Sequence, residues 1–509
     1  MAYFQPNSTV EFFNDLGLSP NYENTLYFAT TDSKDSYFFS LTKIATVSSV
    51  SYVRENRGFI RVELPMSTMF RVGYMRFKNT SFENKWFYAF VKGANYINNI
   101  TTEIEFEIDV MMTWMGIFNL NQCFIERQHS TTDAIGDNII DEGLPCGDYK
   151  NDFETPSGYV GSNGWWYCFA STFDPDNPNT DATGETYGGI YSGVMYSYTN
   201  LVATINQWIR DATTAGKSDG IVGIAMVPRS FITEGGDNVV KLGQTINKPY
   251  STVNGYTPKN NKLFVYPYKY LLGTNMEGNF AEYRYEFFSG VAAQFQFTGA
   301  TGLSSEIICT PVNYKGLQEN YSEKMSMSDF PMCAYSIDSF EAWLAQNKSS
   351  IAANVVSSAA QLATFTAQPM SLASGANMVG QVAQTLGTMM DYARKPPQAG
   401  GAQGTSALFG SGTGTPTKDF YFVGKTINSQ YARIIDDFFT MYGYKMHRVG
   451  TPNMNARPYF TYVKTIGCSI DGNLPVDDAA KIENIFDNGI RFWKDHTQIG
   501  NYTLNNAPT

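Results

Sequence analysis

Strict alternation of side-chain character sets the predicted fold class of the first 150 residues. Between residues 103 and 110 acidic and apolar residues take turns. A strand points successive side chains to opposite faces, so Ile104, Phe106, Ile108 and Val110 would share one face. The opposite face would carry the four carboxylates Glu103, Glu105, Glu107 and Asp109. Shorter runs of the same kind at 59–64, 74–78 and 86–90 predict further antiparallel strands.

The composition agrees with a large, β-rich folded protein. The chain has 509 residues, of which 33 are Tyr and 36 are Phe, and only 16% are charged. These values exclude a disordered chain and a small disulfide-stapled scaffold. The formal net charge is −11, and the sequence contains no segment rich in Lys and Arg. A protein that grips nucleic acid tightly through released counterions is therefore excluded as well.

Targeting and metal-binding signals are missing from the sequence. The opening residues lack a basic region followed by an apolar one, so we expect the protein to be made and to remain in a cytoplasm. The cysteines form no CxxC pair, the three histidines lie far apart, and we expect thiols rather than disulfides or zinc sites. The cysteines are Cys123, Cys146, Cys168, Cys309, Cys333 and Cys468.

The middle and end of the chain add helices to this pattern. Residues 151–245 predict a small mixed α/β insert, with strands at 165–169 and 221–227 around a helix that contains Leu201, Ile205, Trp208 and Ile209. Strands are predicted again at 262–268 and 282–288. Two C-terminal helices are predicted, one at 431–442 with Gly443 as its C-cap and one at 475–486 with Pro475 in its first turn.

One long segment carries no charge at all. Residues 349–390 contain no Asp, Glu, Lys, Arg or His, where the average composition would place about seven charges. Apolar residues recur there at helical spacing in two stretches, which a Gln-Pro and a Ser-Gly pair separate. A short capped helix at 336–344 precedes the segment, and a Gly/Ala/Ser/Thr linker at 398–416 follows it. The pattern predicts a hairpin of two weakly amphipathic helices.

This hairpin has two interpretations. The first is a hydrophobic helix pair buried in the core of an oligomer. The second is a membrane-active device, because two helices of about 18 residues would each span about 27 Å, close to the roughly 30 Å hydrocarbon layer. Each helix would keep one apolar stripe and one neutral polar face, which suits a wet pore better than a lone span. The apolar residues are Ile351, Val355, Val356, Leu362, Phe365, Met370, Leu372, Met378, Val379, Val382, Leu386, Met389 and Met390.

The acidic strand face also has two interpretations. It can be a solvated face whose carboxylates pair across the sheet with Arg61, Arg76 or Lys78. Alternatively, it can be one wall of a conduit, repeated by symmetry, that repels DNA phosphates so that a duplex slides past it. The second interpretation requires a ring of subunits.

No catalytic motif appears in the sequence, and no cofactor is expected. Two GK[ST] triplets, at 216–218 and 424–426, have Asp211 and Asp419 where a phosphate-binding loop needs its first glycine. His129 stands alone and is interpreted as a structural or interface residue rather than as a general base.

Several strings in the chain are similar to one protein family. They are 106–115 (FEIDVMMTWM), 124–130 (FIERQHS), 254–263 (NGYTPKNNKL), 266–268 (YPY), 436–444 (DDFFTMYGY), 467–468 (GC) and 485–493 (IFDNGIRFW). On these strings the chain resembles the tail knob, or distal tail tube, proteins of small short-tailed DNA phages (podoviruses) of Gram-positive bacteria. The matches keep the family's order along the chain. They are weakest in 151–245.

The resemblance implies a non-enzymatic virion protein at the distal end of the tail, mainly β with short helices and tail-tube-like sandwich or barrel elements. It implies a homohexameric tube that conducts double-stranded DNA without sequence recognition and joins a lower collar or proximal tail tube protein. A long hydrophobic loop would plug the lumen and then form a pore in the host cytoplasmic membrane. The tube domain is predicted at 1–150, 246–347 and 418–509, the inserted knob subdomain at 151–245, and the loop at 348–417.

Two other functions stay open from the sequence. A tail-tip enzyme that degrades cell wall is one. A head-tail connector or collar without membrane activity is the other.

Overall fold

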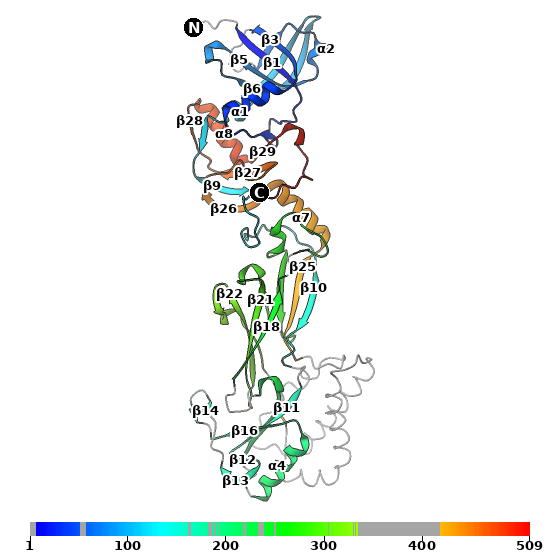
Figure 1. Ribbon diagram of the computed structural model, residues 1–509, viewed down its shortest axis with the longest axis vertical. Coiled ribbons are helices and arrows are strands. Elements are labelled where there is room, and N and C mark those ends of the chain that lie inside the picture. The colour runs from blue at the N-terminus through cyan, green and yellow to red at the C-terminus, as the bar shows by residue number, and fades with distance from the viewer. Residues whose placement is uncertain are drawn as a thin grey trace, which may run out of the picture. The chain divides into compact units, whose positions relative to one another are not determined.

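A computed structural model describes residues 7–50, 58–160, 164–181, 186–187, 190–191, 193–215, 217, 220–232, 239–248, 251–303, 305–328, 330, 332–333 and 418–508. The protein is mainly β with few helices, as the alternation predicts (Figure 1). The chain divides into two compact units. Unit 1 comprises residues 1–148, 255–268 and 427–509, and unit 2 comprises residues 149–254 and 269–426.

Unit 1 contains two main sheets and most of the described helices. A six-stranded sheet has the order β3-β1-β5-β6-β7-β4, and a five-stranded sheet has the order β2-β29-β27-β9-β26. The strands of the first are β1 Ser8–Asn14, β3 Lys43–Val50, β4 Phe59–Val62, β5 Val72–Lys78, β6 Phe87–Asn98 and β7 Thr101–Ile108. Those of the second are β2 Thr25–Leu26, β9 Cys123–Gln128, β26 Tyr444–Gly450, β27 Phe460–Ile466 and β29 Ile490–Trp493. A small pair joins β8 Phe118–Leu120 to β28 Ile470–Gly472.

The six-stranded sheet is buried on both faces along its central strands. Val10, Phe12 and Phe77 contribute to a core on one face, while Phe13 and Tyr74 belong to a second core on the other. Period-2 alternation therefore separates two apolar cores here, rather than core from solvent. The α-helices of unit 1 are α1 Thr31–Ser40, α2 Met66–Met69, α3 Val110–Trp114, α7 Ser429–Tyr442 and α8 Val476–Asn488.

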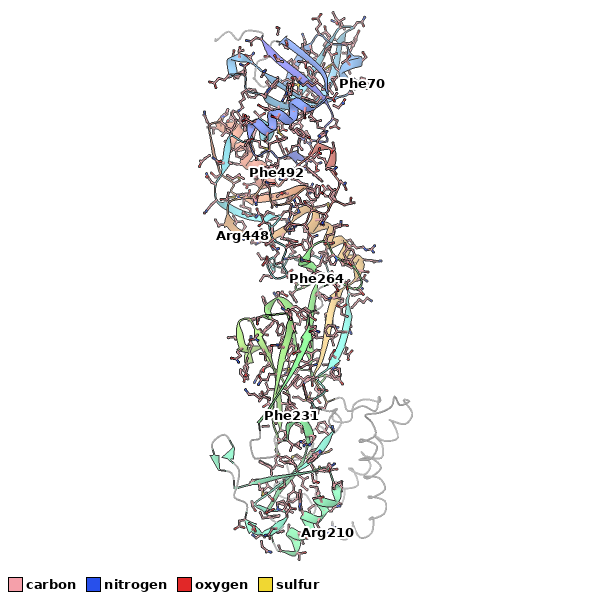
Figure 2. The ribbon with its side chains drawn as sticks, in the orientation of Figure 1. Phe70, Arg210, Phe231, Phe264, Arg448 and Phe492 are labelled. Carbon is pink, nitrogen blue, oxygen red and sulfur yellow. The ribbon has the colours of Figure 1, made fainter. Side chains whose placement is uncertain are left out.

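The second core of unit 1 joins residues from both ends of the chain. Phe38 of α1 lies 4.7 Å from Tyr88 and 5.9 Å from Tyr74, measured between ring centroids. Phe492 of β29, which Figure 2 labels, belongs to the same core, and so does Phe486 of α8. Short 3₁₀ turns at η1 Thr80–Phe82, η4 Asn261–Phe264 and η7 His496–Gln498 complete the unit.

Unit 2 has a larger sandwich-like part. Its sheets have the orders β10-β25-β19-β20 and β18-β21-β22-β23, with β24 also paired to β22. Their side chains share one core that includes Leu271, Phe295 and Phe422. The strands are β10 Tyr149–Pro156, β18 Val239–Asn247, β19 Lys269–Thr274, β20 Phe280–Tyr283, β21 Ala292–Ala300, β22 Glu306–Tyr314, β23 Leu317–Glu319, β24 Met325–Met327 and β25 Tyr421–Ile427, with turns η5 Tyr285–Phe287 and η6 Tyr321–Glu323.

The smaller part of unit 2 has the predicted mixed α/β character. A three-stranded antiparallel sheet, β16-β11-β17, contacts helix α4, and Trp208 of α4 lies 5.4 Å from Phe169 between ring centroids. Of the predicted helix residues, Ile205, Trp208 and Ile209 are buried. The elements are β11 Trp165–Ser171, β12 Phe173–Asp174, β13 Asn177–Asp181, β14 Thr186–Tyr187, β15 Ile190–Tyr191, β16 Met195–Thr199, α4 Val202–Thr214, β17 Ile221–Pro228 and η3 Arg229–Phe231.

One predicted strand is wrong, and another is partly wrong. Residues 262–268 form η4 and a turn, because the N–H groups of Leu263, Val265 and Tyr268 bond to carbonyls three residues back. Leu263, Phe264, Val265 and Tyr268 are buried, and such a short apolar run does not distinguish a strand from a buried turn. In the predicted strand 282–288, only Glu282 and Tyr283 belong to a strand, at the end of β20. Residues Tyr285–Phe287 form the 3₁₀ turn η5.

The C-terminal helices occur where they were predicted. Helix α7 ends at Tyr442 with Gly443 as its cap, and Pro475 precedes α8 as its N-cap rather than lying in its first turn. The predicted domain division groups 246–347 with the first 150 residues, whereas the described part of 269–333 belongs to unit 2. The roles of tube, knob and loop stay predictions. The predicted helix at 336–344 lies outside the described residues.

Candidate functional site

The acidic strand is β7, and three of its predicted carboxylates share one face. Glu103, Glu105 and Glu107 alternate with the buried Thr102, Ile104 and Phe106. Two of the three have cationic partners on neighbouring strands. Arg61 Nε lies 2.8 Å from Glu103 Oε2, and Lys92 Nζ lies 2.7 Å from Glu107 Oε2. Of the three partners predicted for the acidic face, Arg61 is found there.

The other two predicted partners lie elsewhere. Arg76 is buried, with its Nη2 2.7 Å from Glu11 Oε2 and its guanidinium 4.2 Å from the centroid of Trp86. Lys78 Nζ lies 4.8 Å from the centroid of Trp86. The acidic face of β7 therefore carries three carboxylates, and two cations are paired with them.

Asp109 does not share this face. It follows β7 and is fully buried as the N-cap of α3, where its Oδ1 accepts a 2.9 Å hydrogen bond from Met112 N. The Tyr74 hydroxyl donates to its Oδ2 at 2.9 Å. Burial raises the pKa of Asp109 to about 6, and these hydrogen bonds only partly oppose that effect. The sequence signal that could have identified this role is an Asp directly before an apolar helical run.

A lysine lies near this buried carboxylate. Lys34 Nζ donates to the carbonyl oxygens of Met112 and Met115, at 2.8 and 3.1 Å. Burial lowers the pKa of Lys34 to about 8, although Asp35 and Asp109 favour its charged form. The hydrogen bonds of Asp109 and Lys34 thus join α1, α3 and β5, and the role of both residues is structural.

The predicted membrane-active residues, from Ile351 to Met390, lie outside the described residues, but the structure describes the chain on both sides of them. On the N-terminal side, Met332 forms an isolated antiparallel β-bridge with Ala225, and Cys333 N donates a 2.7 Å hydrogen bond to Ile224 O. On the other side, Lys418 Nζ lies 3.0 Å from Glu277 Oε1.

The two flanking segments meet. Lys418 Nζ lies 5.2 Å from the ring centroid of Phe330, and both residues are buried. Described residues on the two sides of the segment 334–417 are therefore in contact. The Phe330–Lys418–Glu277 contact is here called the neck. Sequence reasoning missed the neck because its members are far apart in the chain and carry no motif.

Several of the strings that resemble one family meet in unit 1. Asp436 of α7 is fully buried and accepts hydrogen bonds from the Tyr256 hydroxyl at 2.8 Å, Lys259 N at 2.8 Å and Asn260 N at 3.0 Å. The 254–263 string is thus held against the 436–444 string. This arrangement supports the fold and presents no exposed reactive group.

His129 is also structural. Its Nδ1 accepts from Tyr462 N at 2.8 Å, and its Nε2 lies 3.0 Å from Thr440 O. Burial lowers its pKa to about 3, with further lowering by Arg457. The imidazole is therefore neutral near pH 7, and it links β9, β27 and α7.

The structure also bears on the two GK[ST] triplets and on metal binding. Residues 424–426 lie within strand β25, and Lys217 pairs with Asp181 at 2.7 Å.

Within the described ranges, no group of His, Cys, Asp or Glu side chains is suited to hold a metal ion. Among the helices that the structure describes, none is both long and apolar enough to cross a membrane.

Comparisons with known proteins agree with the resemblance seen in the strings. The family model of the tail knob protein gp9 of Bacillus phage phi29, C-terminal domain, matches residues 235–507, and the caudoviral major tail protein N-terminus matches residues 6–119. The tail knob protein gp9 of Bacillus phage B103 is 26% identical over 606 residues, covering 99% of this chain and all of that protein. The gp9 of Bacillus phage phi29 is also 26% identical, with the same coverage.

A solved structure supports the fold. The tail knob protein gp12 of bacteriophage C1 matches with a TM-score of 0.63 at 14% identity, covering 98% of this chain and 99% of that one. The phi29 model alone covers more than half of the chain. The chain therefore belongs to the tail knob protein gp9 family and is a structural component of a podovirus tail.

Proposed function

We propose that this tail knob protein forms a homohexameric conduit for genome ejection, and that its uncharged segment acts on the host cytoplasmic membrane. The segment, within 348–417, plugs the lumen before ejection and then forms a pore. The conduit joins a lower collar or proximal tail tube protein and passes double-stranded DNA without reading its sequence. It works by geometry and not by catalysis.

The charge-free segment carries this proposal. A stretch without any ionisable residue at 349–390 is costly to expose to water and suits a lipid environment. The neck supports the same idea, because contacts between the two flanks would hold them together when the segment is displaced. Glu277, Phe330 and Lys418 would stay in place while the segment moves.

The acidic face of β7 supports the conduit. Glu103, Glu105 and Glu107 project from one face and outnumber the cations paired with them. If six copies turned this face inward, the wall would repel phosphates, and a duplex would slide past it. Asp109 is not part of this wall, because it is buried within the subunit.

Dye release from liposomes tests the membrane step. The full-length protein is mixed with vesicles that hold a self-quenching dye, at neutral and acidic pH. We expect release from the wild type and a strong reduction in the variants Leu362→Asp and Leu386→Asp, because a charge within the hydrocarbon layer is costly. Leu317→Asp is the matched control, since Leu317 is an exposed leucine in β23.

Equal release by the wild type and the two segment variants would contradict the proposal. Complete absence of release at both pH values would favour a connector or collar. Soluble fragments released from purified peptidoglycan would instead favour a cell-wall-degrading enzyme.

A further inference from the structure

Two cysteines lie side by side in the five-stranded sheet of unit 1. Cys123 is the first residue of β9, and Cys468 follows the end of β27. These strands are antiparallel neighbours, with Phe124 opposite Ile466. Just beyond the pair, Asn121 N donates to Ser469 O at 2.9 Å. The backbone on both sides of the two cysteines is therefore fixed by hydrogen bonds across the strands.

The two thiols also influence each other electrostatically. Cys468 affects the pKa of Cys123, Cys123 affects the pKa of Cys468, and the Thr465 hydroxyl lowers both pKa values. They are 6% and 7% exposed, so both are buried close to the surface. A disulfide bond is about 2 Å long and needs Cα atoms that are already close. Since the ladder fixes the backbone, the bond would need only side-chain movement.

We propose that Cys123 and Cys468 are an oxidisable pair, two thiols in the host cytoplasm and a disulfide in the released virion. The cytoplasm keeps thiols reduced, whereas virion surfaces meet an oxidising environment. In the reaction, both S–H bonds break and one S–S bond forms. The two electrons and two protons pass to dissolved molecular oxygen, which becomes hydrogen peroxide.

The surroundings of the pair make this oxidation slow. Burial and the Asp487 carboxylate raise the pKa of Cys123, and burial is also the main reason why the pKa of Cys468 rises to about 12. The thiolate is the reactive form, so little of it exists near neutral pH. Folding and assembly can therefore finish before the bond forms.

The disulfide would connect distant parts of the chain. Cys123 follows the N-terminal sheet and α3, whereas Cys468 lies just before α8. Asp487 of α8 already accepts from Cys468 N at 3.1 Å and from the Thr465 hydroxyl at 2.8 Å. A covalent link across this long loop restricts the unfolded chain, so the oxidised form of unit 1 should resist denaturant better.

Peptide mapping tests the proposal on the purified full-length chain. One sample is kept in dithiothreitol and another is held in air-saturated buffer, and both are alkylated during denaturation and digested with trypsin. We expect a new cross-linked pair, residues 93–127 joined to 465–481, in the oxidised sample alone. The peptide 285–315, which contains the fully buried Cys309, is the internal control and should remain alkylated in both samples.

Urea unfolding gives a second measurement. The wild type should unfold at a higher urea concentration after oxidation, whereas Cys123→Ser and Cys468→Ser should show no such shift. If the oxidised wild type still yields alkylated Cys123 and Cys468, the proposal is wrong. It is equally wrong if either cysteine is cross-linked mainly to one of the other four. The mapping result does not depend on whether the variants fold.

Discussion

At the scale of single residues, unit 1 depends on buried ionisable groups that the alternation of acidic and apolar residues does not reveal. Asp109 and Lys34 have opposite pKa shifts for the same reason, because burial disfavours both charged forms. A carboxyl whose pKa is raised by folding stabilises the folded state when it is protonated. This contribution is complete below its unfolded pKa and is lost as the pH rises through about 6.

The variant Asp109→Asn should remove this pH dependence. Between pH 6 and pH 4 the wild type should gain about 2 kcal/mol of unfolding free energy from protonation of Asp109, and the variant should not. Urea midpoints of both proteins at pH 7, 6, 5 and 4 measure the difference. Glu83→Gln, at an exposed turn, is the control. Parallel pH profiles for wild type and Asp109→Asn would show that the carboxyl is not coupled to folding.

Asp436 provides a second test at this scale. Removing its carboxylate leaves the Tyr256 hydroxyl and the N–H groups of Lys259 and Asn260 without their acceptor. Asp436→Ala should therefore lower the unfolding free energy of unit 1 by about 3 kcal/mol or more. The neighbouring Asp437→Ala, on the exposed side of α7, should change it by less than about 0.5 kcal/mol. Equal losses in the two variants would rule out the special role of Asp436.

At the scale of elements, the junction between α7 and β26 is fixed by a glycine. Gly443 has φ 65°, and a Cβ built there would lie 2.4 Å from the backbone atoms of Gln128 and His129. Backbone cannot give way as a flexible side chain can. The helix cap that the sequence predicts is therefore also a point of close contact between α7 and β9.

Gly443→Ala should destabilise the protein by about 3 kcal/mol, because strain at positive φ adds to this steric conflict. Gly467→Ala is a matched control, since Gly467 has φ 67° but nothing within 4 Å of its Cβ position. It should cost about 1 kcal/mol. Thermal unfolding of the two variants measures the difference. Similar losses would mean that strain alone, and not the contact with β9, makes a glycine necessary at 443.

The elements also show what the sequence could predict. Strands β5, β6 and β7 and helices α4, α7 and α8 were predictable because periodicity and caps are local signals. Residues 262–268 were not, because a short apolar run is compatible with several buried conformations. Asp109 was misplaced for a related reason. Its acidic side chain continues the alternation of β7 by sequence, but the strand ends at Ile108 and Asp109 turns inward as a cap.

For the candidate site, the charge pattern of each segment could be predicted from the sequence, but the contacts between distant residues could not. The missing charge in 349–390 is visible in the sequence, and so is the acidic face of Glu103, Glu105 and Glu107. The neck is not, because Glu277, Phe330 and Lys418 come together only through the folding of unit 2.

At the scale of the whole molecule, the proposed conduit predicts that the acidic face acts on the DNA that passes through it. We expect phage particles with Glu103→Gln, Glu105→Gln and Glu107→Gln combined to eject DNA more slowly, because the wall repels phosphates less. Fluorescence of a DNA-binding dye during triggered ejection gives the rate at low and high salt. Arg61→Gln, which removes a cation from the same face, is the control and should not slow ejection. Identical rates in all three kinds of particle would contradict a role of this face in the conduit.

The central claim concerns the uncharged segment, and conductance across a planar lipid bilayer tests it most directly. Full-length protein is added to one side, and the current is recorded under a small applied voltage. We predict discrete conductance steps for the wild type and for Leu317→Asp, and their loss in Leu386→Asp. A bilayer that stays silent with the wild type, or steps of equal size and frequency in Leu386→Asp, would contradict the claim that this segment opens a path through the membrane.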